Sequence, residues 1–159
     1  MPAHPGETDD ERWDRNFGDL LQELRVTQTG VQILFAFLLT LAFTQRFTEE
    51  DDFERTVYLV ALLSAACATA LIIAPVAYHR MLFRQGKKEA IVRSAHKMAG
   101  AGLAFVLVAM VCAVLLVTDV VLNRPAALVI SGLTLVLFVS LWFVLPARHR
   151  DDRPSATAE

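Results

Sequence analysis

Four long apolar runs, separated by charged segments, constrain this chain more than any other feature of its sequence. They cover residues 26–44, 57–78, 98–122 and 126–145. Each holds roughly 19 to 25 residues, and an α-helix of that length, rising about 1.5 Å per residue, crosses a hydrocarbon layer of about 30 Å. The sequence therefore predicts an all-α membrane protein with four transmembrane helices in two antiparallel hairpins, a domain of residues 26–147.

The segments outside this domain are polar. Residues 1–10 contain two prolines and no basic-then-apolar leader, so we expect a disordered tail and no cleavable signal. Residues 11–25 carry apolar side chains at helical spacing, which predicts a cytoplasmic amphipathic helix capped by Thr8. This helix either lies on the membrane surface or extends the first crossing. Residues 148–159 have no apolar period, and we expect a second disordered cytoplasmic tail.

Basic residues are concentrated between the second and third runs. This connection, residues 79–97, is interpreted as one cytoplasmic basic loop with six cations: Arg80, Arg84, Lys87, Lys88, Arg93 and Lys97. The other two connections hold only Arg46, Arg55 and Arg124. The positive-inside rule places the six-cation loop in the cytoplasm, and four crossings then place both termini there too. We expect a multi-pass membrane protein with this orientation.

The first run contains a polar seam: Gln28, Gln32, Thr40 and Thr44 lie four or eight residues apart. On a helix this spacing forms one slowly drifting stripe. With Arg25 at its inner end and Asp119 near its outer end, the seam could line an aqueous pathway. The alternative, which we favour, is two local sets of hydrogen bonds between helices.

Asp119 is an ionisable residue at the end of the third apolar run. Charged groups in membrane segments are costly and often mark a pathway or an ion pair. Its position near the outer interface favours a pair with Arg124, Arg46 or Arg55, and handling of protons or ions is the alternative.

Other features favour architecture over chemistry. Small residues in the second and third runs predict close packing of these two helices, and Pro75 predicts a kink or an end in the second. Tyr58, Tyr78 and Trp142 are interpreted as interfacial belt residues. Acidic residues from Glu49 to Glu54 are interpreted as a helix start capped at Thr48 rather than as a calcium loop.

No motif indicates an enzyme, and we expect no cofactor or metal. Phosphate-binding loops, nucleophile elbows and metal quartets are absent from the sequence. Cys67 and Cys112 are interpreted as packing residues. His79 and His96 are interpreted as interfacial, with a bis-imidazole haem site, or a metal site that includes Glu89, as weaker alternatives. A net charge of -2 without a basic aromatic patch argues against nucleic acid.

Two stretches resemble a known family: ELRVTQTGVQILFAFLLTLAF at residues 23–43 and APVAYHRMLFR at residues 74–84. They are similar to small four-helix integral membrane proteins, found mainly in actinobacteria, that are described only as a domain of unknown function. The resemblance covers roughly Arg12 to Leu145. It implies the architecture and an inner-membrane location, and it brings no activity, cofactor or catalytic residue.

The sequence is therefore compatible with two functions of different classes. The first is a non-enzymatic interaction or scaffold protein of the lipid bilayer, with a cytoplasmic protein or a second copy as partner. The second is a small homo-oligomeric channel or transporter that uses the polar seam and Asp119. We favour the first, because four short helices leave little room for a pore in one chain.

Overall fold

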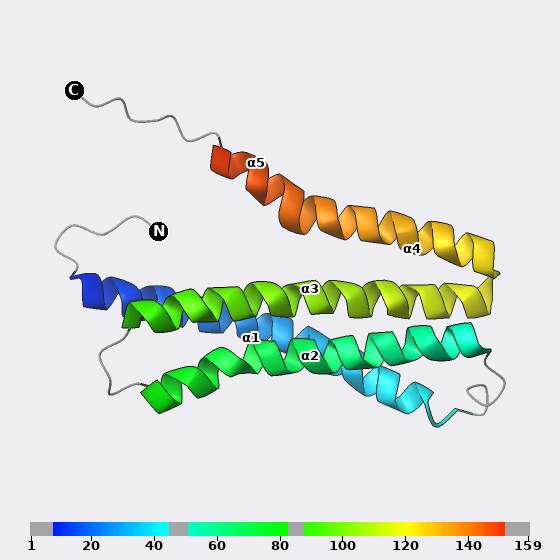
Figure 1. Cartoon of the computed structure of the whole chain (residues 1–159), viewed down its shortest axis with the longest axis horizontal. Coiled ribbons are helices and arrows are strands. Elements are labelled where there is room, and N and C mark those ends of the chain that lie inside the picture. The colour runs from blue at the N-terminus through cyan, green and yellow to red at the C-terminus, as the bar shows by residue number, and fades with distance from the viewer. Residues whose placement is uncertain (1–7, 45–50, 83–87, 152–159) are drawn as a thin grey trace.

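Helices make up nearly all of the structure. A computed structural model describes residues 8–44, 51–82 and 88–151. In these ranges the regular elements are α1 (Asp9–Leu41), α2 (Asp52–Leu82), α3 (Lys88–Val121), α4 (Arg124–Val139), the π-helical segment η2 (Ser140–Val144) and α5 (Leu145–Asp151). Successive long helices run in opposite directions along a common axis (Figure 1).

Four helical segments are long and apolar enough to cross a membrane: Gly18–Leu41, Asp52–Ala77, Ser94–Val121 and Arg124–Arg148. These are the four crossings that the apolar runs predict, although the first and last residues of each segment differ from those of the corresponding run. The chain therefore has the character of a multi-pass membrane protein.

The helices extend beyond the apolar runs at the basic end. The predicted loop of residues 79–97 is wrong in its bounds, because α2 continues to Leu82 and α3 begins at Lys88. Arg80 and Lys97 are therefore helical residues. Main-chain hydrogen bonds do not require apolar side chains, so a helix can project past the hydrocarbon layer into the headgroup region. At the other terminus, α5 continues through Arg148 to Asp151, the first part of the predicted tail.

Helix α1 is continuous from its capped start through the first crossing. The Thr8 hydroxyl accepts a hydrogen bond from the Glu11 main-chain N–H at 3.3 Å, and the Glu11 carboxylate accepts one from the Thr8 N–H at 2.9 Å. This reciprocal capping box confirms the predicted cap at Thr8. No break separates residues 11–25 from the crossing, which favours extension of the first helix over a separate surface helix.

Helices α2 and α3 form the tightest pair, as their small residues predict. The buried positions of α2 follow spacings of three and four, as in coiled coils. They are Tyr58, Ala61, Ala65, Ala68, Ile72 and Pro75, and Ser64 is buried as well. On α3 the matching positions include Ala95, Gly102, Ala109 and Leu116, which are seven residues apart. A Cβ atom added to Gly102 would lie 3.0 Å from Ile72 Cγ1, so glycine allows this close approach.

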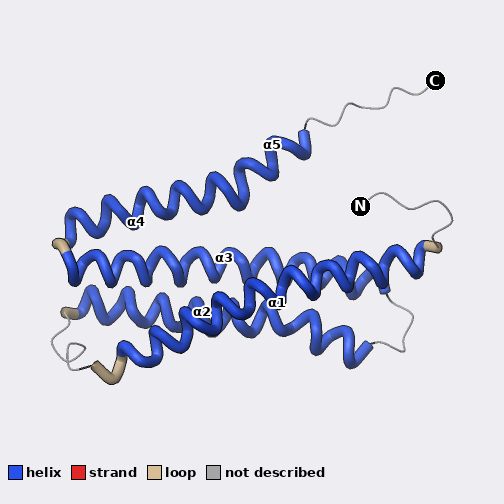
Figure 2. The backbone as a smooth tube through the Cα atoms, turned by 180° about the vertical axis from the view of Figure 1, so that it is seen from behind, coloured by secondary structure: helices blue, strands red, loops and turns tan. Residues whose placement is uncertain are grey.

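Helix α1 crosses this pair obliquely on one side and contacts both members; it lies in front of them in Figure 2. Toward its start, Leu20, Leu24 and Val31 join one apolar cluster with residues of α2 and α3. Toward its end, Leu38 joins a second cluster that contains Tyr58. The two clusters fill the space among the three helices at both ends.

Tyr58 is a core residue and not the belt residue that its position in the run predicts. Its side chain is 4% exposed, and its hydroxyl donates a hydrogen bond of 3.0 Å to the Leu38 carbonyl oxygen. Leu38 lies in the last turn of α1, where carbonyl groups lack partners within their own helix. Tyr58 therefore ties the end of α1 to α2.

Helix α4 is the least packed of the four. Along it only Ala127 and Ser131 are buried, and α4 lies against α3. At η2 the Leu145 N–H donates to the Ser140 carbonyl, five residues back, just before Pro146. A π-turn here accommodates a proline, which has no N–H of its own to donate. Figure 1 shows α4 separating from α3 along its length, with α5 farther away still.

Pro75 has a milder effect within α2. The helix continues through it to Leu82, so Pro75 does not end the helix. Figure 1 shows α2 bending away from α3 over its last turns, which agrees with the predicted kink.

Candidate functional site

An ion cluster joins three helix ends at one end of the bundle. Arg124 begins α4, Asp119 lies in the last turn of α3, and Asp51 immediately precedes α2. The Arg124 guanidinium contacts Asp51 Oδ2 at 2.7 Å and Asp119 Oδ2 at 3.1 Å. It also lies 4.3 Å from the centre of the Phe53 ring, a cation–π distance. The predicted pair of Asp119 with Arg124 is confirmed.

Burial differs among the three charged groups. The Asp119 side chain is 7% exposed, whereas those of Arg124 and Asp51 are 40% and 52% exposed. A carboxylate as buried as Asp119 needs a charged partner, and Arg124 supplies it with two N–H donors. The cluster therefore clamps the ends of α2, α3 and α4 together.

Asp51 has a second role as the cap of α2. Its carboxylate accepts a hydrogen bond from the Glu54 N–H at 2.8 Å, and the Glu54 carboxylate accepts one from the Asp51 N–H at 3.1 Å. The Glu54 N–H, and then Arg124, hold the pKa of Asp51 below its ordinary value. The predicted cap at Thr48 is three residues too early; Thr48 itself lies outside the described residues.

The predicted polar seam does not face the interior of the bundle. Gln28 is half-buried, while Arg25, Gln32, Thr40 and Thr44 are exposed. Residues four apart advance by about 400° around a helix of 3.6 residues per turn, so each step drifts by about 40°. The polar seam consequently begins with Gln28 at the edge of the α1 face that contacts the bundle. By Thr40 the seam faces away from the bundle.

The two threonines of the seam bond to their own helix. The Thr40 hydroxyl donates to the Ala36 carbonyl at 2.9 Å, and the Thr44 hydroxyl donates to the Leu41 carbonyl at 2.8 Å. Neither hydroxyl joins α1 to a neighbouring helix through these bonds. The hydrogen bonds between helices that the sequence favours are thus not made by Thr40 and Thr44.

The structure describes the side chains of only two of the six basic residues in the predicted loop. Arg80 and Lys97 are exposed on α2 and α3. Arg84 and Lys87 lie outside the described residues, and so do the side chains of Lys88 and Arg93. The two described cations mark the end of the bundle opposite the Arg124 cluster.

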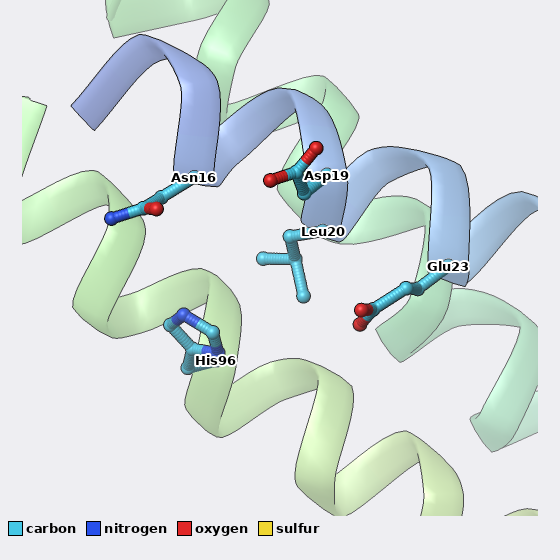
Figure 3. Close-up of a pocket in the computed structure, with 5 residues that line it drawn as sticks. All are labelled: Asn16, Asp19, Leu20, Glu23 and His96. Atoms are coloured by element: carbon cyan, nitrogen blue, oxygen red, sulfur yellow. The ribbon is translucent and has the colours of Figure 1, made fainter. Parts of the chain in front are cut away.

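A shallow cavity of about 170 Å³ lies between the first turns of α1 and α3. Asn16, Asp19, Leu20 and Glu23 line it from α1, and His96 lines it from α3. Figure 3 shows Leu20 between Asn16 and Glu23 on the side of α1 that faces His96, with the Asp19 carboxylate directed away from His96. We call this the acidic hollow, because its two carboxylates are both exposed.

The acidic hollow was not predicted, although part of its signal was present. Positions 16, 19, 20 and 23 share one face of a helix, as the 3.6-residue period requires. What the sequence alone does not reveal is that His96, more than 70 positions away, lies opposite that face.

Metal and cofactor ligands are not grouped in the part of the chain that the structure describes. No set of three His, Cys, Asp or Glu side chains there could hold a metal ion. Cys67 and Cys112 are both free thiols. The side chains of His79 and Glu89 lie outside the described residues, so the haem and metal alternatives for them stay predictions.

Comparisons with known proteins place the chain in a family. The profile of a family described as "Family of unknown function (DUF6328)" matches residues 6–146. The match covers most of the 159 residues, so the chain belongs to this family. Neither a curated protein nor a solved structure matches the chain.

Proposed function

We propose that this member of the DUF6328 family is an inner-membrane protein with both termini in the cytoplasm, and that it acts by binding other proteins. In this proposal it is neither an enzyme nor a conducting pore. Its four crossings hold the protein in the bilayer, and its exposed faces and cytoplasmic helix ends contact the partner proteins.

The observation that carries this proposal is the apolar interior of the single chain. The two buried clusters consist of leucine, isoleucine, valine, alanine and one tyrosine, and they follow the bundle from one end to the other. Of the seam residues, only Gln28 is partly covered by the bundle. A hydrated pathway needs polar side chains along its length, and among the described residues the buried polar ones are only Ser64 and Ser131, besides the Tyr58 hydroxyl that is bonded to Leu38.

Asp119 also favours a structural role over transport. Proton and ion carriers keep an ionisable group available to the pathway. Here Arg124 neutralises Asp119 and Asp51 joins the same cluster, so the carboxylate is committed to holding helix ends. The orientation rests on Arg80 and Lys97 at the opposite end, where cytoplasmic cations are expected.

The acidic hollow is the surface that we assign to a cytoplasmic protein partner. Asp19 and Glu23 contribute two exposed carboxylates to the lining of the hollow, which His96 and the apolar side chain of Leu20 complete together with Asn16. Such a surface suits a short basic segment with one apolar side chain.

Affinity purification from native membranes tests this assignment. Replacing Asp19→Asn together with Glu23→Gln removes the charges but keeps the buried Leu20 and Leu24. We expect the co-purifying set to lose a partner, whereas Asp52→Asn, an exposed acid at the other end, should leave the set unchanged. An unchanged set in the double variant would argue against the hollow as the contact.

A channel built from several copies is the second candidate, because Gln32 and Thr40 face outward and could line a space between subunits. The threonine hydroxyls already donate within α1, which leaves few free polar groups for such a lining. Proton and monovalent-cation flux into vesicles tests it. We expect wild type and Asp119→Asn to match empty vesicles, and flux that depends on Asp119 would overturn the binding-protein proposal.

A further inference from the structure

The outward face of α1 carries a narrow stripe of small and polar residues. We call Thr29, Gln32, Ala36 and Thr40 the outer stripe; all four are exposed. They recur at spacings of three and four, the period that keeps side chains on one face of a helix. The opposite face holds Leu24, Val31 and Leu38, which are 8%, 2% and 0% exposed.

Gln32 is the distinctive member of the outer stripe. It lies nine residues before the end of α1 at Leu41, or about 14 Å along the helix, which is close to the middle of a hydrocarbon layer of about 30 Å. In the described structure no hydrogen bond satisfies its amide. A glutamine side chain is too short to reach either interface from that depth, so acyl chains would leave its donors and acceptors unpaired.

The neighbours of Gln32 leave room for another helix. Ala36 is small, and the Thr29 hydroxyl donates to the Arg25 carbonyl at 3.1 Å, as Thr40 does to Ala36. These residues therefore present small, internally satisfied surfaces, which let helix backbones approach closely in a membrane. The exposed apolar side chains of Val26, Ile33 and Phe37 border the outer stripe on one side.

We propose that the outer stripe is the contact surface for α1 of a second copy of this chain, with the two Gln32 amides hydrogen-bonded to each other at mid-membrane. The inference rests on the proposed function in one respect, since it requires α1 to cross the bilayer.

The amide group identifies a second copy as the occupant. A carboxamide carries both an acceptor oxygen and donor N–H groups, so two identical side chains satisfy each other. A twofold axis brings the same residue of both copies together, which is the geometry that a self-complementary contact needs. Lipid tails offer no partner, and a different membrane protein would need its own polar residue at the same depth.

Disulfide crosslinking in native membranes tests the contact directly. The background replaces Cys67→Ala and Cys112→Ala, because both native thiols are free. Into it we introduce Ala36→Cys, which keeps Gln32, or the control Val129→Cys, which is 63% exposed on α4 and lies five residues after its start at Arg124. Both positions are thus five residues from a helix end on the same side of the bundle.

We expect a dimer of this chain from Ala36→Cys and little or none from Val129→Cys. Equal crosslinking of the two variants, or none from Ala36→Cys, would overturn the proposal. Crosslinking of Ala36→Cys to a different protein would also overturn it and would assign the outer stripe to that partner.

Energy transfer between labelled copies in vesicles gives a second measurement. Gln32→Leu should lower the dimer association constant by about threefold to thirtyfold, the loss of one or two interhelical hydrogen bonds. Gln28→Leu, one turn away on the flank of α1, should change it much less. Equal effects of the two variants would contradict the role of Gln32.

Alkaline extraction of the same membranes separates failure of this inference from failure of the proposed function. Protein released by extraction is not integral, and both proposals then fail. Protein that is retained but monomeric overturns the dimer contact alone.

Discussion

The close approach of α2 and α3 at Gly102 leads to a sharp prediction about two glycines on one helix. Gly100 and Gly102 both lie inside α3, two residues apart and on different faces. A Cβ atom at Gly100 would meet nothing within 4 Å. A Cβ atom at Gly102 would lie 3.0 Å from Ile72 Cγ1, 3.4 Å from Leu71 Cβ and 3.6 Å from the Ala68 carbonyl oxygen.

The magnitude follows from two opposing effects of a glycine-to-alanine change. In a helix interior, alanine is favoured over glycine by about 1 kcal/mol, and this gain applies to both positions. At Gly102 the new methyl group also has to displace Ile72, which is 1% exposed and has little space to move into. Overpacking of this kind costs about 1–3 kcal/mol.

Gly100→Ala should therefore raise the free energy of unfolding by up to about 1 kcal/mol. Gly102→Ala should leave it unchanged or lower it by up to about 2 kcal/mol, so that the two variants differ by about 1–3 kcal/mol. Because the helix-propensity gain is shared, this difference isolates the packing between α2 and α3.

Reversible unfolding in mixed micelles of mild detergent and increasing dodecyl sulfate, followed by circular dichroism, measures the difference. Leucine at both positions extends the test, since a larger side chain fits the open surface at Gly100 but not the contact at Gly102. Equal stabilities of the paired variants would show that α2 does not approach α3 at Gly102, and the packing described here would then be wrong.

Three further predictions use the same unfolding assay. Tyr58→Phe removes the hydrogen bond to the Leu38 carbonyl and should lower the free energy of unfolding by about 0.5–1.5 kcal/mol; no change would mean that the bond does not form. Ser131→Ala should leave stability equal or higher by up to about 1 kcal/mol, because Ser131 Oγ is buried without a partner among the described residues; a marked loss would reveal a missing partner. The pKa of Asp51 is lower in the folded protein than in the unfolded chain, so its stabilising effect is complete above the unfolded pKa and is lost as the pH falls through the folded one. Asp51→Asn should flatten stability against pH in that acidic range, and an unaltered slope would contradict the assignment.

The crossings and the tightest contact of the fold could be predicted from the sequence. Apolar runs of membrane-spanning length gave the four crossings, since length and composition alone set that requirement. Small residues at regular spacing gave the α2–α3 contact, and Thr8 with Glu11 gave the start of α1. These features are local or periodic, and a single chain segment carries the whole signal.

The remaining features depend on which face of a helix meets which neighbour. Tyr58 looked like a belt residue because its place in the run is terminal, but its partner Leu38 is 20 positions away. The four-residue spacing of the polar seam suggested one continuous face of α1. Each such step, however, rotates the side chain by about 40° around the helix, so Gln32 and Thr40 point away from the bundle. His96 opposite Asp19 and Glu23 likewise follows from tertiary packing alone.

Water accessibility at Gln32 tests most directly whether this protein acts by association and not by conduction. Gln32→Cys is made in the cysteine-free background, and membranes that contain it are treated with a charged, membrane-impermeant thiol reagent. Thr44→Cys, which lies beyond the end of α1, serves as the accessible control. A dry contact between copies predicts rapid labelling of Thr44→Cys and none of Gln32→Cys. Rapid labelling of Gln32→Cys would place water along the outer stripe and would contradict a dry contact between copies.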